Sequence, residues 1–193
     1  MAPLNVPVAN TALVLIDLQL GIIAGATAPY ASSVIVDRAA RLATACRERG
    51  VTVVLVHVDP GPNGMLFPHP EVDQPRPPTQ FTPEWIEFAP ALGRQPSDVV
   101  ITKHQPNAFY STDLDVQLQR RGITTILLGG ISTNVGVEAT ARAAHERGYE
   151  QVFIEDVMAA RDPDLHAHSV RRIFPTLGRV RTLDDVMAAL GSP

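Results

Sequence analysis

Continuous apolar, β-branched runs alternate with amphipathic stretches along this chain, and this alternation limits the folds that it can adopt. The runs do not alternate residue by residue between apolar and polar side chains. Continuous runs are typical of strands that are buried on both faces of a parallel sheet. The predicted strands span residues 12–17, 51–58, 98–103, 123–130, 151–156 and, more weakly, 178–182.

Helical spacing of apolar residues fills most of the segments between these strands. The alternation predicts a doubly wound α/β fold, a mostly parallel, six-stranded sheet with helices on both faces in three Rossmann-like layers. The length of 193 residues suits one domain better than two, so we expect a single domain over residues 1–193. The predicted helices span residues 32–49, 112–121, 134–148, 164–174 and 183–190.

One segment departs from the alternation. Residues 59–97 contain 10 of the 17 prolines, which excludes a continuous helix there. Within the segment, the FTPEWIEF stretch has a proline that is well placed to begin a short helix. A connection of this length is more often a lid or an interface arm than passive chain.

Charge and composition restrict the classes of partner. The formal net charge is −4 and the arginines are scattered, so no basic face for nucleic acid or anionic membrane is predicted. The N-terminal stretch has no cationic and apolar signal pattern, and no run is long enough to span a bilayer. The single Cys46 excludes an intrachain disulfide and a cysteine-based zinc site. We therefore expect a cytoplasmic protein that binds a small molecule.

Ionisable residues close two of the predicted strands. Asp17 ends the first strand, and Lys103, the only lysine among the 16 basic residues, ends the third. In open parallel sheets, ligands bind outside the carboxyl ends of the strands. A carboxylate that follows the apolar ALVLI run is desolvated unless a cation or a hydrogen-bond donor meets it. We therefore expect Asp17 and Lys103 to meet, although Asp17 also suits a cap of the following turn and Lys103 a solvated strand end.

The segment LLGGISTNVGVEATARAA, residues 127–144, has the pattern of a buried strand, a glycine-rich turn and a helix start. The first turn of such a helix is where a hydrolase places a nucleophile, because the free N–H groups and the helix dipole stabilise negative charge. This chain has Gly136 in that place. Any predicted function must therefore explain why the position that suits a nucleophile is occupied by glycine.

Three motifs together resemble those of the isochorismatase-like hydrolase superfamily, in the same order and at matching separations: LVLIDLQ, VVITK with NAFYSTDLD after it, and GGISTNVGVEATARAA. The resemblance implies a catalytic triad of Asp, Lys and Cys, with the first two roles at Asp17 and Lys103 and the third position at Gly136. It also implies a cis peptide bond between Ile131 and Ser132, and an oxyanion hole formed by the N–H groups of Ser132 and Gly136. Association into homo-oligomers is a further implication of the resemblance.

Amidase-type members of the superfamily form an acyl-enzyme intermediate on a cysteine. With glycine at that position, this chain lacks the thiol that the intermediate requires. Members that hydrolyse a vinyl ether resemble this chain in having glycine there, and they use the Asp as a general acid while water adds. We therefore expect a cofactor-free hydrolase in which Asp17 moves protons, Lys103 stabilises negative charge and Gly136 leaves room for water or a substrate group. The HQPN stretch after Lys103 lacks the Trp-Arg-Tyr-Ser sequence of isochorismatases, which disfavours isochorismate as the substrate.

Two alternatives stay open at this point. In the first, Gly136 marks a binding or interaction protein on a hydrolase scaffold that has lost its activity. In the second, Gly136 replaces the cysteine of an amidase-type cysteine hydrolase. For a substrate pocket we expect Gln19, Trp85, Phe109 and Tyr110, although core packing explains the aromatic residues about as well.

Histidines supply the remaining candidates. Some members of the superfamily bind a metal after the second strand, and the nearest equivalents here are His57, Asp59 and His69. The compact Asp-x-His spacing is missing, so we expect no metal and no cofactor. His166 and His168 are two positions apart on a predicted helix and point to different faces, and we expect both to lie at the surface.

Overall fold

A six-stranded, all-parallel sheet forms the centre of the computed structural model, which describes residues 4–74 and 79–191. The spatial order is β3-β2-β1-β4-β5-β6, and every neighbouring pair is parallel, so the predicted doubly wound architecture is confirmed. All residues of β1 and β4, the two central strands, are buried, as their continuous apolar sequences predict. The strands are β1 (Thr11–Ile16), β2 (Thr52–Val58), β3 (Val99–Lys103), β4 (Thr125–Ile131), β5 (Glu150–Ala159) and β6 (Arg179–Arg181).

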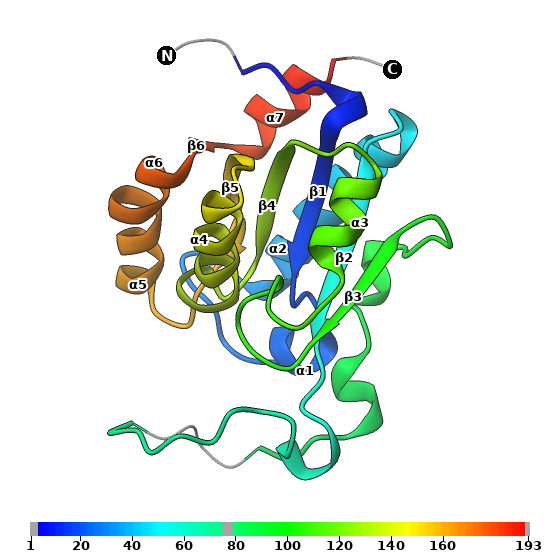
Figure 1. Ribbon diagram of the computed structural model, residues 1–193. Coiled ribbons are helices and arrows are strands. Elements are labelled where there is room, and N and C mark those ends of the chain that lie inside the picture. Colours follow the sequence, from blue (N-terminus) through cyan, green and yellow to red (C-terminus); the bar gives the residue numbers. More distant parts are fainter. Residues whose placement is uncertain (1–3, 75–78, 192–193) are drawn as a thin grey trace.

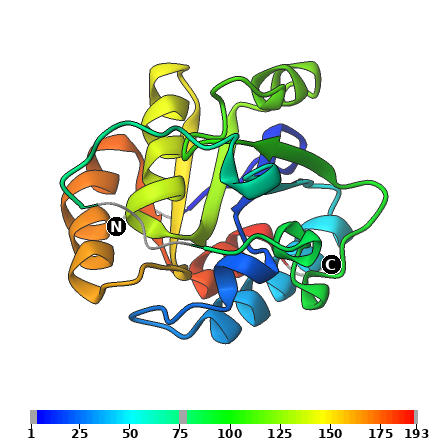
Figure 2. The same ribbon diagram turned by 90° about the horizontal axis from the view of Figure 1, so that it is seen from below.

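Helices cover both faces of this sheet (Figure 2). Because successive side chains of a strand point to opposite faces, each face has its own apolar cluster. Leu13 and Leu15 of β1 pack toward α2 (Ser32–Glu48) and α7 (Leu183–Leu190). Val14 and Ile16 belong to the opposite cluster. The helices on that side are α3 (Leu114–Arg120), α4 (Glu138–Glu146), α5 (Pro163–His168) and α6 (Phe174–Leu177).

Two of the predicted helices contain π-helical turns. The helix predicted at 134–148 consists of the π turn η5 (Thr133–Val137) followed by α4. The helix predicted at 164–174 consists of α5, a second π turn η6 (Ser169–Ile173) and α6. A short helix, α1 (Leu20–Ile23), after β1 was not predicted.

Much of the described part of the connection, residues 59–74 and 79–97, runs away from the body of the molecule below the carboxyl ends of the strands (Figure 1). These described residues contain three short 3-10 helices, and each has a proline in its first turn, which agrees with the helix start predicted in FTPEWIEF. The prolines at 75, 77 and 78 lie outside the described residues. These helices are η2 (Pro62–Gly64), η3 (Pro83–Ile86) and η4 (Pro90–Leu92), and η1 (Val8–Asn10) precedes β1.

None of the helices in residues 4–74 and 79–191 combines the length and the hydrophobicity that a bilayer crossing requires.

Candidate active site

Asp17 and Lys103 meet at the carboxyl rim of the sheet. The Lys103 Nζ atom donates a hydrogen bond to Asp17 Oδ2 at 2.8 Å and a second one to the Pro106 carbonyl at 3.1 Å. Both side chains are almost completely buried, with 6% of Asp17 and 1% of Lys103 exposed. The predicted pairing of these two residues is therefore present.

The order of the strands explains why a lysine makes this contact. β3 is not a neighbour of β1, because β2 lies between them. Lys103 aligns with Val58, the last residue of β2, and its side chain passes this strand end to reach Asp17. The four-carbon stem of lysine spans such a distance, whereas a shorter cationic side chain does not.

Asp17 has an unusual backbone conformation and an unusual electrostatic environment. Its φ angle of 53° lies in the left-handed region, which Asp and Asn tolerate better than most residues. Burial raises the pKa of the Asp17 carboxyl group, and the charges of Lys103 and His57 offset part of that increase. The Oδ1 atom is buried and has no hydrogen-bond partner among the protein groups that the structure describes. This oxygen is available to exchange a proton.

Gly136 faces the ion pair from the π turn η5. A Cβ atom at this position would lie 3.1 Å from Asp17 Oδ2, 3.5 Å from Lys103 Nζ and 2.9 Å from Ile16 Cγ2. Any side chain at position 136 would therefore enter the space beside Asp17 and Lys103. The peptide bond between Ile131 and Ser132 is cis, as the resemblance implies.

The Gln19 side chain joins the end of β2 to the connection that follows it. Its side-chain amide accepts a hydrogen bond from the Val58 N–H at 2.8 Å and donates to the carbonyl groups of Val58 and Trp85 at 2.9 and 3.2 Å. Gln19 is fully buried, so these backbone bonds occupy the amide that we expected to face a substrate. Trp85 packs edge-on against Phe81, with ring centroids 5.1 Å apart.

The two aromatic residues after Lys103 have different surroundings. The structure places Phe109 in the core, where it stacks on Tyr149 and lies under the guanidinium of Arg147, rather than beside Asp17. Tyr110 is 63% exposed. Apolar packing between α3 and α4 therefore accounts for Phe109, which was predicted as a pocket residue.

His166 corrects the prediction that both helix histidines lie at the surface. His168 is exposed, but His166 is buried and its Nδ1 atom lies 2.9 Å from Thr133 Oγ1. Residues that are two positions apart on a helix point to nearly opposite sides, so a helix that packs on the core with one side favours the burial of one of the two. The same spacing that we used to separate the two histidines could have identified one of them as buried.

The histidines near β2 have partners within the protein. The His57 ring nitrogens lie 2.9 Å from the Ile86 carbonyl and 2.8 Å from Thr102 Oγ1, and His69 Nε2 lies 3.1 Å from the Gly64 carbonyl. Among the residues that the structure describes, no group of three His, Cys, Asp or Glu side chains is arranged to hold a metal ion.

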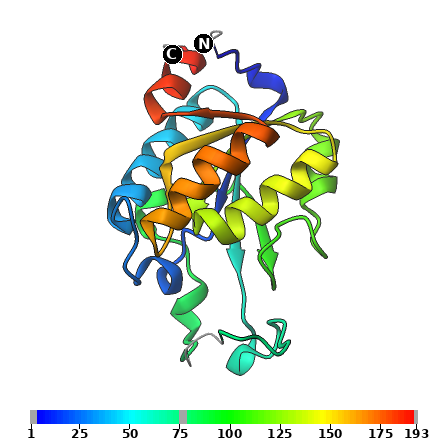
Figure 3. The same ribbon diagram turned by 90° about the vertical axis from the view of Figure 1, so that its left-hand side faces the viewer.

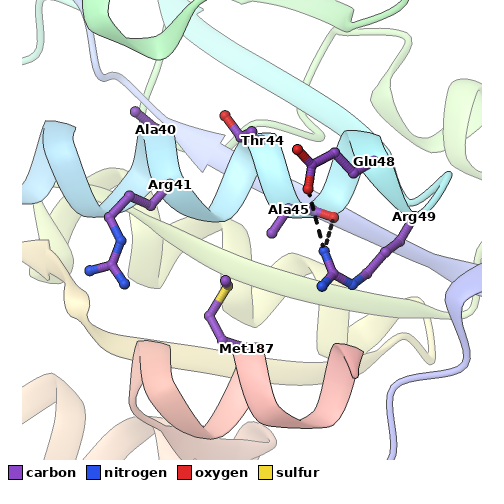
Figure 4. Close-up of a pocket in the computed structure, with 7 residues that line it drawn as sticks. All are labelled: Ala40, Arg41, Thr44, Ala45, Glu48, Arg49 and Met187. Carbon is purple, nitrogen blue, oxygen red and sulfur yellow. Dashed lines mark hydrogen bonds and ion pairs between the residues drawn. The ribbon is translucent and has the colours of Figure 1, made fainter. Parts of the chain in front are cut away.

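Two surface hollows lie away from the rim. One, of about 450 Å³, lies between α2 and α7 and is lined by residues such as Arg41, Glu48 and Met187 (Figure 4). The other, of about 230 Å³, lies at the amino ends of β2 and β3 beside Asp98. Neither hollow includes Asp17, Lys103 or Gly136.

The fold and the rim together define a class of protein, a doubly wound α/β protein with a buried Asp–Lys ion pair at the carboxyl ends of its strands. An isochorismatase domain model matches residues 11–185. The chain is 43% identical over 181 residues to YecD, an uncharacterized isochorismatase family protein of Escherichia coli O157:H7, with coverage of 94% of this chain and 96% of that protein. The chain therefore belongs to the isochorismatase family.

Solved structures agree with this assignment. An isochorismatase family protein from Burkholderia thailandensis is 47% identical and has a TM-score of 0.92, with 98% of each chain covered. The N-carbamoylsarcosine amidase from Thermoplasma acidophilum is 27% identical and has a TM-score of 0.70, with 91% of this chain and 97% of that chain covered. This chain is thus an isochorismatase-family hydrolase with relatives that include an amidase.

Proposed function

We propose that this protein hydrolyses a small molecule by proton transfer at Asp17, with water as the nucleophile and without a covalent enzyme intermediate. The observation that carries the proposal is the geometry of one carboxylate. Asp17 Oδ2 is held by Lys103 Nζ at 2.8 Å, while its buried Oδ1 has no partner among the described protein groups. One oxygen is therefore oriented and the other is available for chemistry.

The environment of Asp17 suits both directions of proton transfer. Because burial raises the pKa of its carboxyl group, Asp17 is able to hold a proton and act as a general acid. Once the proton has moved to the substrate, the Lys103 ammonium stabilises the carboxylate that remains. The carboxylate then takes a proton from the attacking water, which returns Asp17 to its starting state.

Gly136 keeps a side chain away from the reacting groups in this scheme. A side chain at position 136 would lie against the ion pair, where even a Cβ is crowded, so water or a substrate group reaches this space only when the surrounding chain moves. The chain supplies no thiol at the site, because its one cysteine, Cys46, lies in α2 and is buried. The N–H groups of Ser132 and Gly136 are our candidates for stabilising negative charge on a substrate oxygen.

The test is a screen followed by a matched pair of substitutions. The screen offers the purified protein small amides, ureido compounds, esters and vinyl ethers, and hydrolysis is followed by mass spectrometry. On any substrate found, Asp17→Asn should lower kcat by at least about a hundredfold, because proton transfer typically contributes that much or more.

The control uses another largely buried ion pair. Asp98 pairs with Arg47 at 2.8 Å, its side chain is 1% exposed, and it lies at the opposite end of the sheet. Asp98→Asn should therefore lower the melting temperature but keep the parental kcat. Parental activity in Asp17→Asn would refute the proposal.

A binding protein without activity is the second candidate, and the burial of the site favours it. Only 6% of Asp17 and 1% of Lys103 are exposed, so a substrate needs a movement of the surrounding chain to reach them. A chain that hydrolyses none of the four compound classes, yet binds a small molecule in an Asp17-dependent manner, would support this candidate instead.

A further inference from the structure

One buried and one part-buried polar contact attach the turn that carries Gly136 to the helices beside it. Thr133 Oγ1 lies 2.9 Å from His166 Nδ1, and Ser169 Oγ donates a hydrogen bond to Glu138 Oε2 at 2.7 Å. Thr133 and Ser169 are fully buried, and His166 is 7% exposed.

These contacts bracket the π turn η5. Thr133 is its first residue, and Glu138 begins α4 directly after it. Their partners lie in α5 and at the start of the second π turn, η6. Figure 3 shows α4 and the α5–α6 segment side by side on the same face of the sheet. Both ends of the turn with Gly136 are therefore attached to one neighbouring segment.

Packing alone does not require an imidazole at this position. The apolar cluster on this face of the sheet includes Val137, Val170 and Phe174, so an apolar side chain at position 166 would avoid the cost of desolvating polar groups. A buried polar pair instead fixes the orientation of the groups that it joins. Burial and the charge of Arg171 lower the pKa of His166, so the imidazole is neutral at neutral pH.

We propose that His166 is a positioning residue, which holds Thr133 and thereby keeps Gly136 turned toward Asp17 and Lys103. The inference rests on the proposed function, because the position of the turn matters for hydrolysis only if the rim is the site of reaction. The backbone of residue 136 lies so close to the ion pair that a Cβ atom there would contact Asp17 and Lys103. A small rotation of η5 would change the space beside the pair, and misplacements of about 1 Å are enough to cost an enzyme much of its rate.

Amide hydrogen exchange, resolved by peptide, tests the inference without a substrate. His166→Ala should accelerate exchange in residues 132–138 by about tenfold or more, while β1 and β2 keep their parental rates. His168→Ala, two positions away and exposed, is the matched control and should leave the turn unchanged.

Two further variants separate positioning from general stability. His166→Asn places an amide near the position of Nδ1 and should restore most of the parental protection. Thr133→Val removes the same contact from the other side with little change in volume. The double variant Thr133→Val/His166→Ala should exchange no faster than the single variants, because both remove one interaction.

The outcomes are distinguishable. Parental exchange of residues 132–138 in Thr133→Val, or uniform acceleration throughout the chain in both variants, would overturn the positioning role. If His166→Ala does not fold, Thr133→Val and His166→Asn decide the question. A turn that loosens as expected in a chain without hydrolytic activity would uphold the positioning role and contradict the proposed function.

Discussion

At the scale of single residues, the Asp17–Lys103 pair is a feature that stability alone does not explain. Burying two charges costs several kcal/mol per ion, and apolar replacements of such pairs are often neutral or stabilising. One oxygen of this carboxylate is held by Lys103, and the other has no hydrogen-bond partner among the described protein groups. The proposed proton transfer would use the second oxygen.

A substitution of Gly136 tests directly whether the reaction uses the space beside the Asp17–Lys103 pair. Gly136→Ala adds a Cβ that must displace the Ile16 side chain and that contacts Asp17, so we expect kcat to fall about a hundredfold. The free energy of unfolding should fall by about 1–3 kcal/mol through overpacking. Both quantities are measured by steady-state kinetics and urea denaturation.

Gly25→Ala is the matched control, because a Cβ there meets only the Ile22 carbonyl at an ordinary distance of 3.7 Å. Its kinetics should equal those of the parent. An active Gly136→Ala variant would show that the reaction does not use this space.

The two charged residues could be predicted from the sequence because each one closes a strongly apolar run. His166 could not be placed in the same way, because its partner Thr133 is 33 positions away and no local pattern joins them. Gln19 and Phe109 were assigned to a pocket by residue type, whereas the structure shows bonds to the backbone for one and core packing for the other.

At the scale of elements, the end of β4 depends on a glycine that lets two strands approach closely. Gly130 has a φ angle of 125°, and a Cβ atom there would collide with the backbone of Ile16 in β1. The neighbouring strand therefore reaches the rim beside Asp17 only because position 130 has no side chain.

Gly130→Ala should lower the free energy of unfolding by about 3 kcal/mol or more, because the clash is with backbone that has no alternative position. Gly148→Ala provides the comparison, since its φ angle is also positive, at 80°, but a Cβ there meets no atom of the described residues within 4 Å. It should cost only about 1–2 kcal/mol of backbone strain. Equal losses in urea denaturation would contradict this account.

Strand positions were predicted well because buried parallel strands have continuous apolar sequences. The helix positions were predicted about as well, but the π turns η5 and η6 were not, because they keep the helical spacing of apolar residues while they change the hydrogen-bond register. π turns are frequent at functional sites, and the first of them carries Gly136.

At the scale of the whole molecule, the topology creates the site. Asp17 and Lys103 are 86 positions apart, and their contact depends on the order β3-β2-β1. The sequence predicts that both residues lie on one rim, but it does not state which strands are neighbours. The homo-oligomer that the resemblance implies stays a prediction.

Stability should depend on pH through His166. The unfolded imidazole binds a proton below its ordinary pKa of 6.5, whereas burial and Arg171 lower the pKa of the folded one. Unfolding therefore takes up a proton as the pH falls below about 6.5, and the free energy of unfolding should decrease there, with a limiting slope of about 1.4 kcal/mol per pH unit.

Urea denaturation between pH 5 and pH 8 measures this effect, and His166→Asn removes the titrating group. The variant should show a shallower decrease below about pH 6.5, with the two curves parallel at higher pH. An identical decrease in parent and variant would mean that other groups cause the acid dependence.

The central claim is that water attacks the substrate without a covalent intermediate on the protein. Its most direct test is intact-protein mass spectrometry after rapid quenching during turnover of a substrate from the screen. We predict that the parent protein keeps its unmodified mass at every time point, while Gly136→Cys forms a transient adduct if it accepts an acyl group. A transient covalent adduct on the parent chain would contradict the claim.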